Sequence, residues 1–268
     1  MRQLLSRSNH PLFIACVLLS CLSCDFTPPL HKKVVKAQEF ISSQEYAKAI
    51  YQYEELLKGD LPKDMKIKVS YQLGELYSLQ MGDNEKAIEY YNAVKEIADD
   101  PLWQVKAEEK VGDINFSYLR HYAPSAVSYK RLLSFVPKLA KQDFYEYRLG
   151  MSYLNDGQLE KGADIFSTIQ KNSNHEYFIQ SFYAMGLLYF GQKEWARAIV
   201  ILKEYIKRET RKENVAEAKF IMANSYEMLE KLKLAYDLYY SILGDYPNTE
   251  VVQNRLNSIY NRRIARRR

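Results

Sequence analysis

Residues 148–174 read RLGMSYLNDGQLEKGADIFSTIQKNSN, and this stretch decides the fold. Small and aromatic residues recur in it at helical spacing: Gly150, Tyr153, Gly157, Gly162, Phe166 and Ile169. The spacing predicts two helices in close contact, because a glycine lets the backbones approach while an aromatic ring one turn later fills the space beside the contact. Gly157 stands where the chain must turn. The stretch is therefore predicted to be a helix–turn–helix unit.

The same pattern recurs along most of the chain. If Gly150 is taken as a marker residue, its equivalents follow at separations of 37, 38, 38, 36 and 37 residues. The six marker residues are Ala37, Gly74, Gly112, Gly150, Gly186 and Ala223. Unrelated helical sequence would not keep phase over this length, so the chain is predicted to stack one kind of unit.

The units resemble the tetratricopeptide repeat (TPR), a helix–turn–helix of about 34 residues. The resemblance covers roughly Lys32 to Thr249. It implies an all-α, right-handed TPR superhelix, an α-solenoid, with six repeats in residues 31–249. Residues 250–268 are expected to form a capping helix and an arginine-rich tail, because no second helix follows the apolar positions of this last segment.

Two of the repeats depart from the pattern. In the second, one extra residue precedes the turn glycine, Gly82. In the third, Asn115 replaces the expected tyrosine and Pro124 opens the second helix. The third is the most irregular repeat, and two explanations stay open: a surface altered for function, or drift.

The first residues indicate an export signal. Arg2 and Arg7 precede the apolar run LFIACVLL, residues 12–19, which is too short for a transmembrane helix. Leu18-Leu19-Ser20-Cys21 resembles a bacterial lipobox, in which a signal peptidase cuts before a cysteine that carries diacylglycerol. Residues 1–20 are then the signal peptide, and residues 21–30 the lipidated cysteine and a tether. Lipidation at Cys24, an ordinary secretory signal and a short membrane anchor are the alternatives.

The choice of cysteine affects localisation. Asp25 follows Cys24, and by resemblance to enteric lipoproteins an aspartate in that place favours the inner membrane. Cys21 is followed by leucine, which points to the outer membrane and a protein facing the periplasm. No cysteine lies beyond Cys24, so the folded body is predicted to contain no disulfide.

Charge and motifs argue against several function classes. Of 38 basic residues, two lie in the signal and five in the tail, which leaves 31 against 33 acidic ones; nucleic-acid binding is therefore disfavoured. The four histidines have no metal-ligand spacing, and no nucleophile or phosphate-loop motif occurs. The sequence thus predicts no enzyme, no metal and no cofactor.

The tail carries arginines that are expected either to solubilise the end of the chain or to contact anionic lipid or an acidic partner. They are Arg262, Arg263, Arg266, Arg267 and Arg268.

The TPR resemblance also implies a binding surface. In TPR proteins the first helix of each repeat lines a concave groove, at positions three before, one after and four after the marker. Among the residues at these positions, those assigned to the partner-binding groove are Tyr71, Phe116, Tyr147, Met151, Tyr183, Leu187, Phe190 and Phe220. They are predicted to bind an extended or helical protein segment. The alternative is that many of them pack between neighbouring repeats.

The ending YPNTEVVQNRL, together with the lipobox and the length, resembles TPR lipoproteins of the bacterial envelope, in particular the BamD-like type attached to the outer-membrane β-barrel assembly machine. The resemblance implies a non-enzymatic interaction scaffold, lipid-anchored in the envelope, that assists outer-membrane protein assembly. The alternatives are a scaffold for cell-wall synthesis, secretion or motility, and an envelope enzyme without a readable motif.

Overall fold

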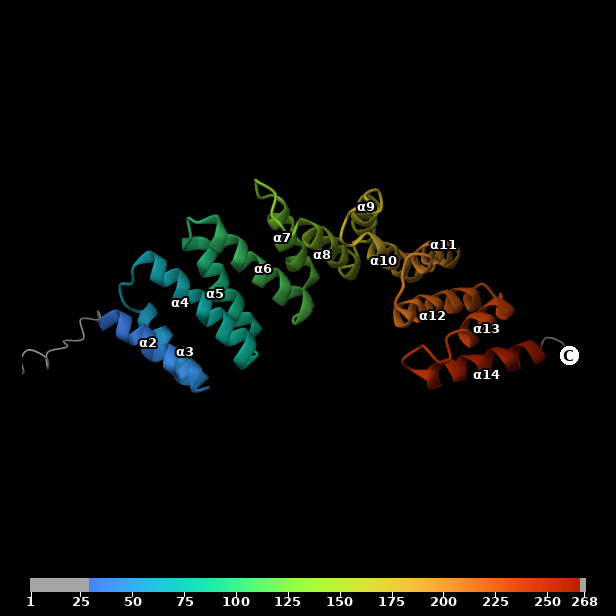
Figure 1. The fold of residues 1–268 in the computed structure, drawn as a ribbon, viewed down its shortest axis with the longest axis horizontal. Coiled ribbons are helices and arrows are strands. Elements are labelled where there is room, and N and C mark those ends of the chain that lie inside the picture. Colours follow the sequence, from blue (N-terminus) through green and yellow to red (C-terminus); the bar gives the residue numbers. More distant parts are fainter. Residues whose placement is uncertain (1–28, 266–268) are drawn as a thin grey trace, which may run out of the picture. The chain divides into compact units, whose positions relative to one another are not determined.

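The computed structural model describes residues 29–265, and within them every regular element is a helix (Figure 1). Residues 1–28 and 266–268 lie outside the described residues. The predicted lipidation sites Cys21 and Cys24 and the last three arginines belong to these segments. The chain divides into two compact units, with the boundary between Pro62 and Lys63.

The first unit contains one helix pair, α2 (Pro29–Ser42) and α3 (Tyr46–Leu57), which pack against each other. Small residues stand where the two helices touch: Ala37 and Ala49 are both fully buried. They occupy the repeat positions that Gly150 and Gly162 hold further along the chain. The pair therefore has the packing predicted for a first repeat.

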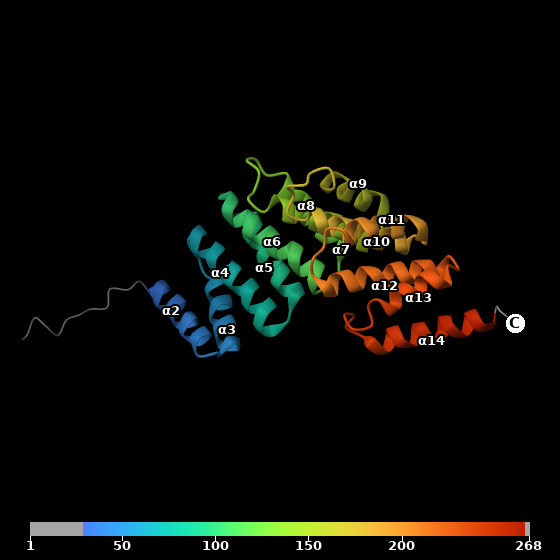
Figure 2. The same ribbon diagram turned by 45° about the vertical axis from the view of Figure 1, so that its right-hand side comes forward.

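The second unit contains the remaining helices. In chain order they are α4 (Lys63–Leu76), the π-helical turn η1 (Tyr77–Met81), α5 (Asn84–Ile97), α6 (Pro101–Ser117), α7 (Tyr122–Leu133), α8 (Gln142–Asn155), α9 (Leu159–Ile169), α10 (Phe178–Gly191), α11 (Trp195–Ile206), α12 (Lys212–Met228), α13 (Leu232–Tyr240) and α14 (Thr249–Ala265). Each α-helix packs against the next one along the chain (Figure 1 and Figure 2). The predicted all-α solenoid of helix pairs with one final helix is confirmed.

The marker glycines lie where the two helices of a repeat touch, as predicted. A Cβ atom added at Gly150 would lie 2.8 Å from ring atom Cε1 of Phe166, and one at Gly186 would lie 2.5 Å from Cδ2 of Leu202. Contacts this short are not tolerated in packed interiors. Gly162 fits the same account, because its added Cβ would lie 3.3 Å from the backbone oxygen of Gly150.

The turn between the two helices has the same backbone in every repeat. One residue of each turn has a positive φ: Gln44, Gly82, Arg120, Gly157, Lys193 and Glu230. Glycine adopts this left-handed conformation without strain, whereas other L-residues adopt it at a cost. The sequence predicted the turns at Gly82 and Gly157. Four further turns use the same conformation without glycine, so the geometry belongs to the repeat.

The extra residue of the second repeat is absorbed within its first helix. The last turn of that helix widens to the π-helix η1, and the backbone N–H of Gly82 donates to the carbonyl of Tyr77. A single π-turn is a usual way for a helix to accommodate an inserted residue. The insertion therefore leaves the phase of the following repeats unchanged.

The irregular third repeat is fitted into the stack by local hydrogen bonds. Asn115 is buried, and its side-chain amide donates to the carbonyl of Val111 at 2.9 Å. Ser125, on α7, contacts Ser152 of α8 through their hydroxyl groups at 3.1 Å. Small polar residues thus replace larger side chains at this junction and find partners inside it.

Candidate functional site

The candidate site is the face formed by the first helices of neighbouring repeats. Helix α8 contacts α10, and α10 contacts α12, although a second helix separates each pair in the sequence. Residues at equivalent repeat positions on these three helices therefore lie on adjacent rods. We call the set the first-helix strip: Tyr147, Met151, Tyr183, Leu187, Phe190 and Phe220.

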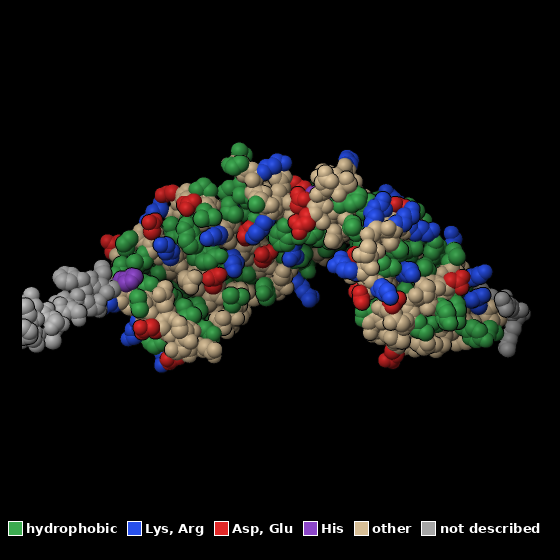
Figure 3. All heavy atoms as spheres, viewed as in Figure 1, with side chains coloured by type: hydrophobic (Ala, Val, Ile, Leu, Met, Phe, Trp, Pro, Cys, Tyr) green, Lys and Arg blue, Asp and Glu red, His purple; other side chains and the backbone are tan. Residues whose placement is uncertain are grey.

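Every predicted groove residue is partly buried. This holds for the six residues of the first-helix strip and for Tyr71 on α4 and Phe116 on α6. None belongs to the fully buried core and none is fully exposed. Elsewhere on the visible face, apolar side chains are interspersed with charged ones (Figure 3). Each of these side chains is therefore buried in part, as packing between repeats requires, and exposed in part, as a binding surface requires.

Several of these rings stack on an aromatic residue at the entry to the next first helix. Tyr147 stacks on Tyr177 with a centroid distance of 4.6 Å and an interplanar angle of 13°. Phe220 stacks on Tyr246 at 4.5 Å and 13°. Offset or stacked aromatic pairs of this kind add roughly 0.5–1.5 kcal/mol beyond the burial of area. Stacking fixes the orientation of the ring, so the strip is a preorganised surface.

The tyrosines of the candidate site are neutral phenols at physiological pH. Burial raises the pKa of Tyr71 to about 12, with a further contribution from the carboxylates of Glu75 and Glu109. Burial likewise raises the pKa of Tyr183 to about 12, and the nearby carboxylate of Glu217 adds to the effect. A neutral phenol offers one hydrogen-bond donor beside an apolar ring, which suits it to recognise a peptide backbone.

Two acidic residues of α6, Asp113 and Glu109, have partners within the chain. The hydroxyl of Tyr129 donates to Oδ1 of Asp113 at 2.7 Å. Glu109 accepts from the hydroxyl of Tyr145 and from Nζ of Lys141, the latter at 3.1 Å. The Asp113 contact lies within the third repeat, whereas the Glu109 contacts join the third repeat to the fourth. The two acids therefore contribute to packing within and between these repeats.

Arg148 is a candidate binding residue that sequence reasoning missed. Its guanidinium lies over the ring of Phe116 at 4.3 Å and over that of Phe144 at 5.2 Å. The equivalent positions of the next two repeats are Ala184 and Ile221. An arginine at a position that is apolar in the neighbouring repeats was the sequence signal that could have identified Arg148. A guanidinium held between aromatic rings can bind a carboxylate of a partner.

A second missed feature occurs in the first, fourth and fifth repeats, where a cation lies over the aromatic residue three positions after the marker. Lys48 lies over Phe40 at 5.7 Å, Lys161 over Tyr153 at 5.4 Å, and the guanidinium of Arg197 over Tyr189 at 4.2 Å. In the sequence these pairs are eight residues apart, across the turn. They tie the second helix to the first in successive repeats, and we assign them a structural role.

The described part of the arginine tail is engaged with its own chain. Arg262 donates to Oε1 of Glu227 and to Oε1 of Glu230, both at 2.8 Å. Arg263 lies over the ring of Tyr236 at 5.8 Å. Arg262 thereby fastens α14 to α12. Contact of the tail with anionic lipid or an acidic partner stays a prediction.

Two further findings concern residues 29–265. In that range no set of three or more histidine and acidic side chains is placed to hold a metal ion. In the same range no helix has the length and apolar character needed to cross a membrane.

Comparison with known proteins identifies the repeats. The family model described as "Tetratricopeptide repeat" matches residues 68–99 and 180–209, which include most of the pair α4–α5 and of the pair α10–α11. The chain therefore contains TPR units. No curated protein sequence matches the chain.

Solved structures share the fold at low sequence identity. PilW, described as a widely conserved type IV pilus biogenesis factor, has a TM-score of 0.53 and 18% identity over 86% of this chain and 98% of its own. The structure of Naa15/Naa10 bound to HypK-THB has a TM-score of 0.59 and 18% sequence identity over 87% of this chain and 34% of the matched chain. The apo form of RapI has a TM-score of 0.53 and 14% sequence identity over 95% of this chain and 80% of its own. At these identities the likeness establishes the fold alone.

Proposed function

We propose that this protein is a non-enzymatic scaffold that holds a segment of a partner protein on the first-helix strip. The observation that carries the proposal is the repetition of partly buried aromatic and apolar side chains on α8, α10 and α12, three helices in contact. Ring contacts hold the four aromatic side chains of the strip in place before a partner arrives, so these side chains lose little conformational entropy on binding.

The chemistry of the strip defines the segment that it would take. Met151 and Leu187 supply apolar surface, and the neutral phenol of Tyr183 supplies an aromatic ring with an oxygen that can accept a hydrogen bond. Arg148, between two phenylalanine rings, adds one cation at the edge of this surface. A partner with apolar side chains on one face and a carboxylate at one end would satisfy these groups.

We further propose that the scaffold is anchored in the bacterial envelope through lipid on Cys21. The support is the sequence Leu18-Leu19-Ser20-Cys21 directly after a short apolar run. A single acyl chain binds membranes only marginally, whereas the several chains of a bacterial lipoprotein hold stably. The purified protein should partition into detergent, and Cys21→Ser should release it. Acyl chains found by mass spectrometry on Cys24 alone would contradict this assignment.

Within the envelope we propose a role in outer-membrane protein assembly, supported by the resemblance of the lipobox and of the ending YPNTEVVQNRL to that type of lipoprotein. A crosslinking pull-down from membranes tests the role. Recovery of β-barrel assembly proteins would support it. Recovery of cell-wall synthesis, secretion or motility proteins in their place would contradict it, and the PilW fold likeness makes pilus proteins the first to look for.

The strip itself is tested with Tyr183→Ala combined with Phe190→Ala. Aromatic hot spots contribute about 2 kcal/mol or more each, so capture of the partner should weaken by well over tenfold. Tyr118→Ala is the matched control, because Tyr118 is 61% exposed and lies outside the strip. Circular dichroism on the same samples separates two failures. Loss of helicity would assign the two residues to the core, and unchanged capture would place the partner elsewhere.

A further inference from the structure

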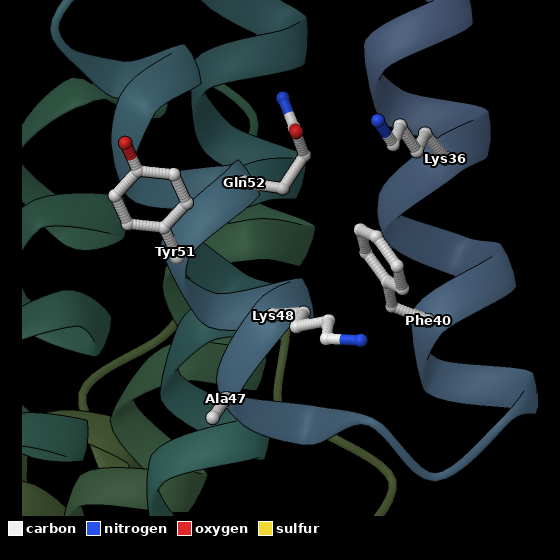
Figure 4. Close-up of a pocket in the computed structure, with 6 residues that line it drawn as sticks. All are labelled: Lys36, Phe40, Ala47, Lys48, Tyr51 and Gln52. Carbon is white, nitrogen blue, oxygen red and sulfur yellow. The ribbon is translucent and has the colours of Figure 1, made fainter.

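The first helix pair has an open pocket on one side. The pocket measures about 410 Å³ and is lined by Lys36, Phe40, Ala47, Lys48, Tyr51 and Gln52. Phe40 and Lys36 reach into it from α2, and Lys48 reaches toward Phe40 from α3 (Figure 4). All of the lining residues belong to the first unit. The pocket is therefore a property of this helix pair alone.

In later repeats the same positions are covered by a helix. Three repeat positions are involved: the residue directly before the marker, the third residue after it and the fifteenth residue after it. In the fifth repeat they are Met185, Tyr189 and Ile201, which pack against Phe166 and Ile169 of the preceding second helix, α9. The preceding repeat thus supplies an apolar helix that fills this side of the pair.

The fourth and sixth repeats follow the same rule. In the fourth, Leu149, Tyr153 and Ile165 pack with buried residues of α7. In the sixth, Met222, Tyr226 and Leu238 pack with buried residues of α11. The equivalent residues of the first repeat are Lys36, Phe40 and Gln52, which are the residues that line the pocket. The pocket therefore corresponds to the place that a preceding second helix fills in these later repeats, and no helix of the described residues fills it.

The side chains around this place are part apolar and part basic. Phe40 is partly buried, whereas Tyr51 is 64% exposed and Val35 is 36% exposed. The ammonium groups of Lys36 and Lys48 lie 5.8 Å and 5.7 Å from the centre of the Phe40 ring. Lys36 stands where the fourth, fifth and sixth repeats have the buried residues Leu149, Met185 and Met222.

We propose that this pocket binds an amphipathic helix of a partner protein that carries acidic side chains beside its apolar stripe. A helix is specified because a helix fills the equivalent place in three later repeats. Acidic side chains are specified because a purely apolar helix would bury the Lys36 ammonium without a partner, which is strongly unfavourable. The surface is distinct from the first-helix strip, so the inference does not depend on the proposed function.

The last helix of a second copy does not meet this specification. Helix α14 carries Arg255, Arg262 and Arg263 and a single acidic residue, Glu250. Stacking the end of one molecule on the start of another would therefore offer Lys36 and Lys48 only one carboxylate of α14. An acidic helix from a different protein satisfies the pocket, and the basic end of this chain does not.

The test uses two synthetic helical probes labelled with fluorescein and the full chain. The acidic probe carries phenylalanine and isoleucine three residues apart, as in α9, with glutamates on both flanks; the basic probe has lysines in place of the glutamates. Fluorescence anisotropy should show binding of the acidic probe only. Lys36→Glu combined with Lys48→Glu should weaken it at least tenfold and create binding of the basic probe. Lys58→Glu is the control, since Lys58 pairs with Glu55 outside the pocket.

Several results would overturn the proposal. The proposal is wrong if the acidic probe does not bind, if both probes bind equally, or if Lys58→Glu weakens binding of the acidic probe as much as the double variant does. A photo-crosslinking residue at Gln52 identifies other occupants. Crosslinks to residues 1–28 of the same chain would show that this segment occupies the pocket. Self-association that Phe40→Ala abolishes would show that a second copy of the chain occupies it. Circular dichroism of each variant confirms that the helices remain folded.

Discussion

Helices α12 and α14 are matched in length and differ in what covers them. Each has 17 residues, and they begin 37 residues apart, one repeat period. The marker residue of α12 is Ala223, which is fully buried against residues of α13. The equivalent residue of α14 is Tyr260, which is 57% exposed. Within residues 29–265, no helix follows α14. The small marker residue is thus required by the second helix that packs on it.

The two helices also differ in how they are held at their ends. The start of α12 follows Glu209, whose carboxylate accepts hydrogen bonds from Arg211, Asn214 and Tyr205. The start of α14 is held by a neutral group, because Oδ1 of Asn248 accepts from the backbone N–H of Val251 at 3.1 Å. Interior and terminal helices should therefore respond differently to substitution and to pH.

The largest effect is expected for an interior marker. Gly150→Leu would place a side chain against the ring of Phe166, which is fully buried and has no room to withdraw. Overpacking of this kind lowers the free energy of unfolding by about 1–3 kcal/mol or more. Tyr260→Leu, at the matched terminal position, should change it by less than about 0.5 kcal/mol. Urea unfolding of both variants measures the difference, and equal midpoints would contradict the assigned repeat phase.

The next effect concerns the attachment of α14. Arg262→Ala would leave Glu227, whose side chain is 10% exposed, without its 2.8 Å partner. Arg262 is itself 36% exposed, so solvent screening limits the loss to about 1–2 kcal/mol. Arg255→Ala is the matched control, because its guanidinium lies 3.9 Å from the same carboxylate. Amide hydrogen exchange in α14 should rise in the first variant. Equal exchange in both would contradict the assignment of Arg262 as the fastening residue.

A smaller effect is expected when the pH is lowered. The hydrogen bonds from Arg211 hold the pKa of Glu209 well below its usual range. A carboxyl whose folded pKa is depressed stabilises the protein above its unfolded pKa of about 4.3, and this stabilisation is lost as the pH falls toward the folded pKa. Glu209→Gln should therefore make the unfolding free energy fall less steeply below about pH 4.3. Urea unfolding of the variant and of the unchanged protein at several pH values measures the two slopes.

The sequence predicted those features of the fold that depend on residue size. Gly150 and Gly162 set the phase of the repeats, because only small residues, glycine or alanine, stand where the two helices of a repeat touch. The left-handed turn at Lys193 was not predicted, because a lysine gives no sign of a positive φ. The sequence also could not predict how far the side chains of the candidate site are exposed. Whether Tyr147 faces a partner or a neighbouring repeat depends on Tyr177, a ring 30 residues away in the sequence.

The smallest effect concerns the turns that join the two helices of interior repeats. Lys193 has a φ of 61° and Glu230 a φ of 58°, conformations that glycine adopts without strain. Relief of this strain is worth about 1–2 kcal/mol, and the added flexibility of the unfolded chain cancels about half of it.

Lys193→Gly should therefore raise the unfolding free energy by up to about 1 kcal/mol. Glu230→Gly removes the same strain but also the 2.8 Å contact with Arg262 that helps to fasten α14, so its gain should be smaller. Gly157→Ala, at the equivalent turn with a φ of 77°, should lower stability. Thermal unfolding of the three variants measures the order. If Glu230→Gly stabilised as much as Lys193→Gly, the contact between Glu230 and Arg262 would make no contribution to holding the terminal helix.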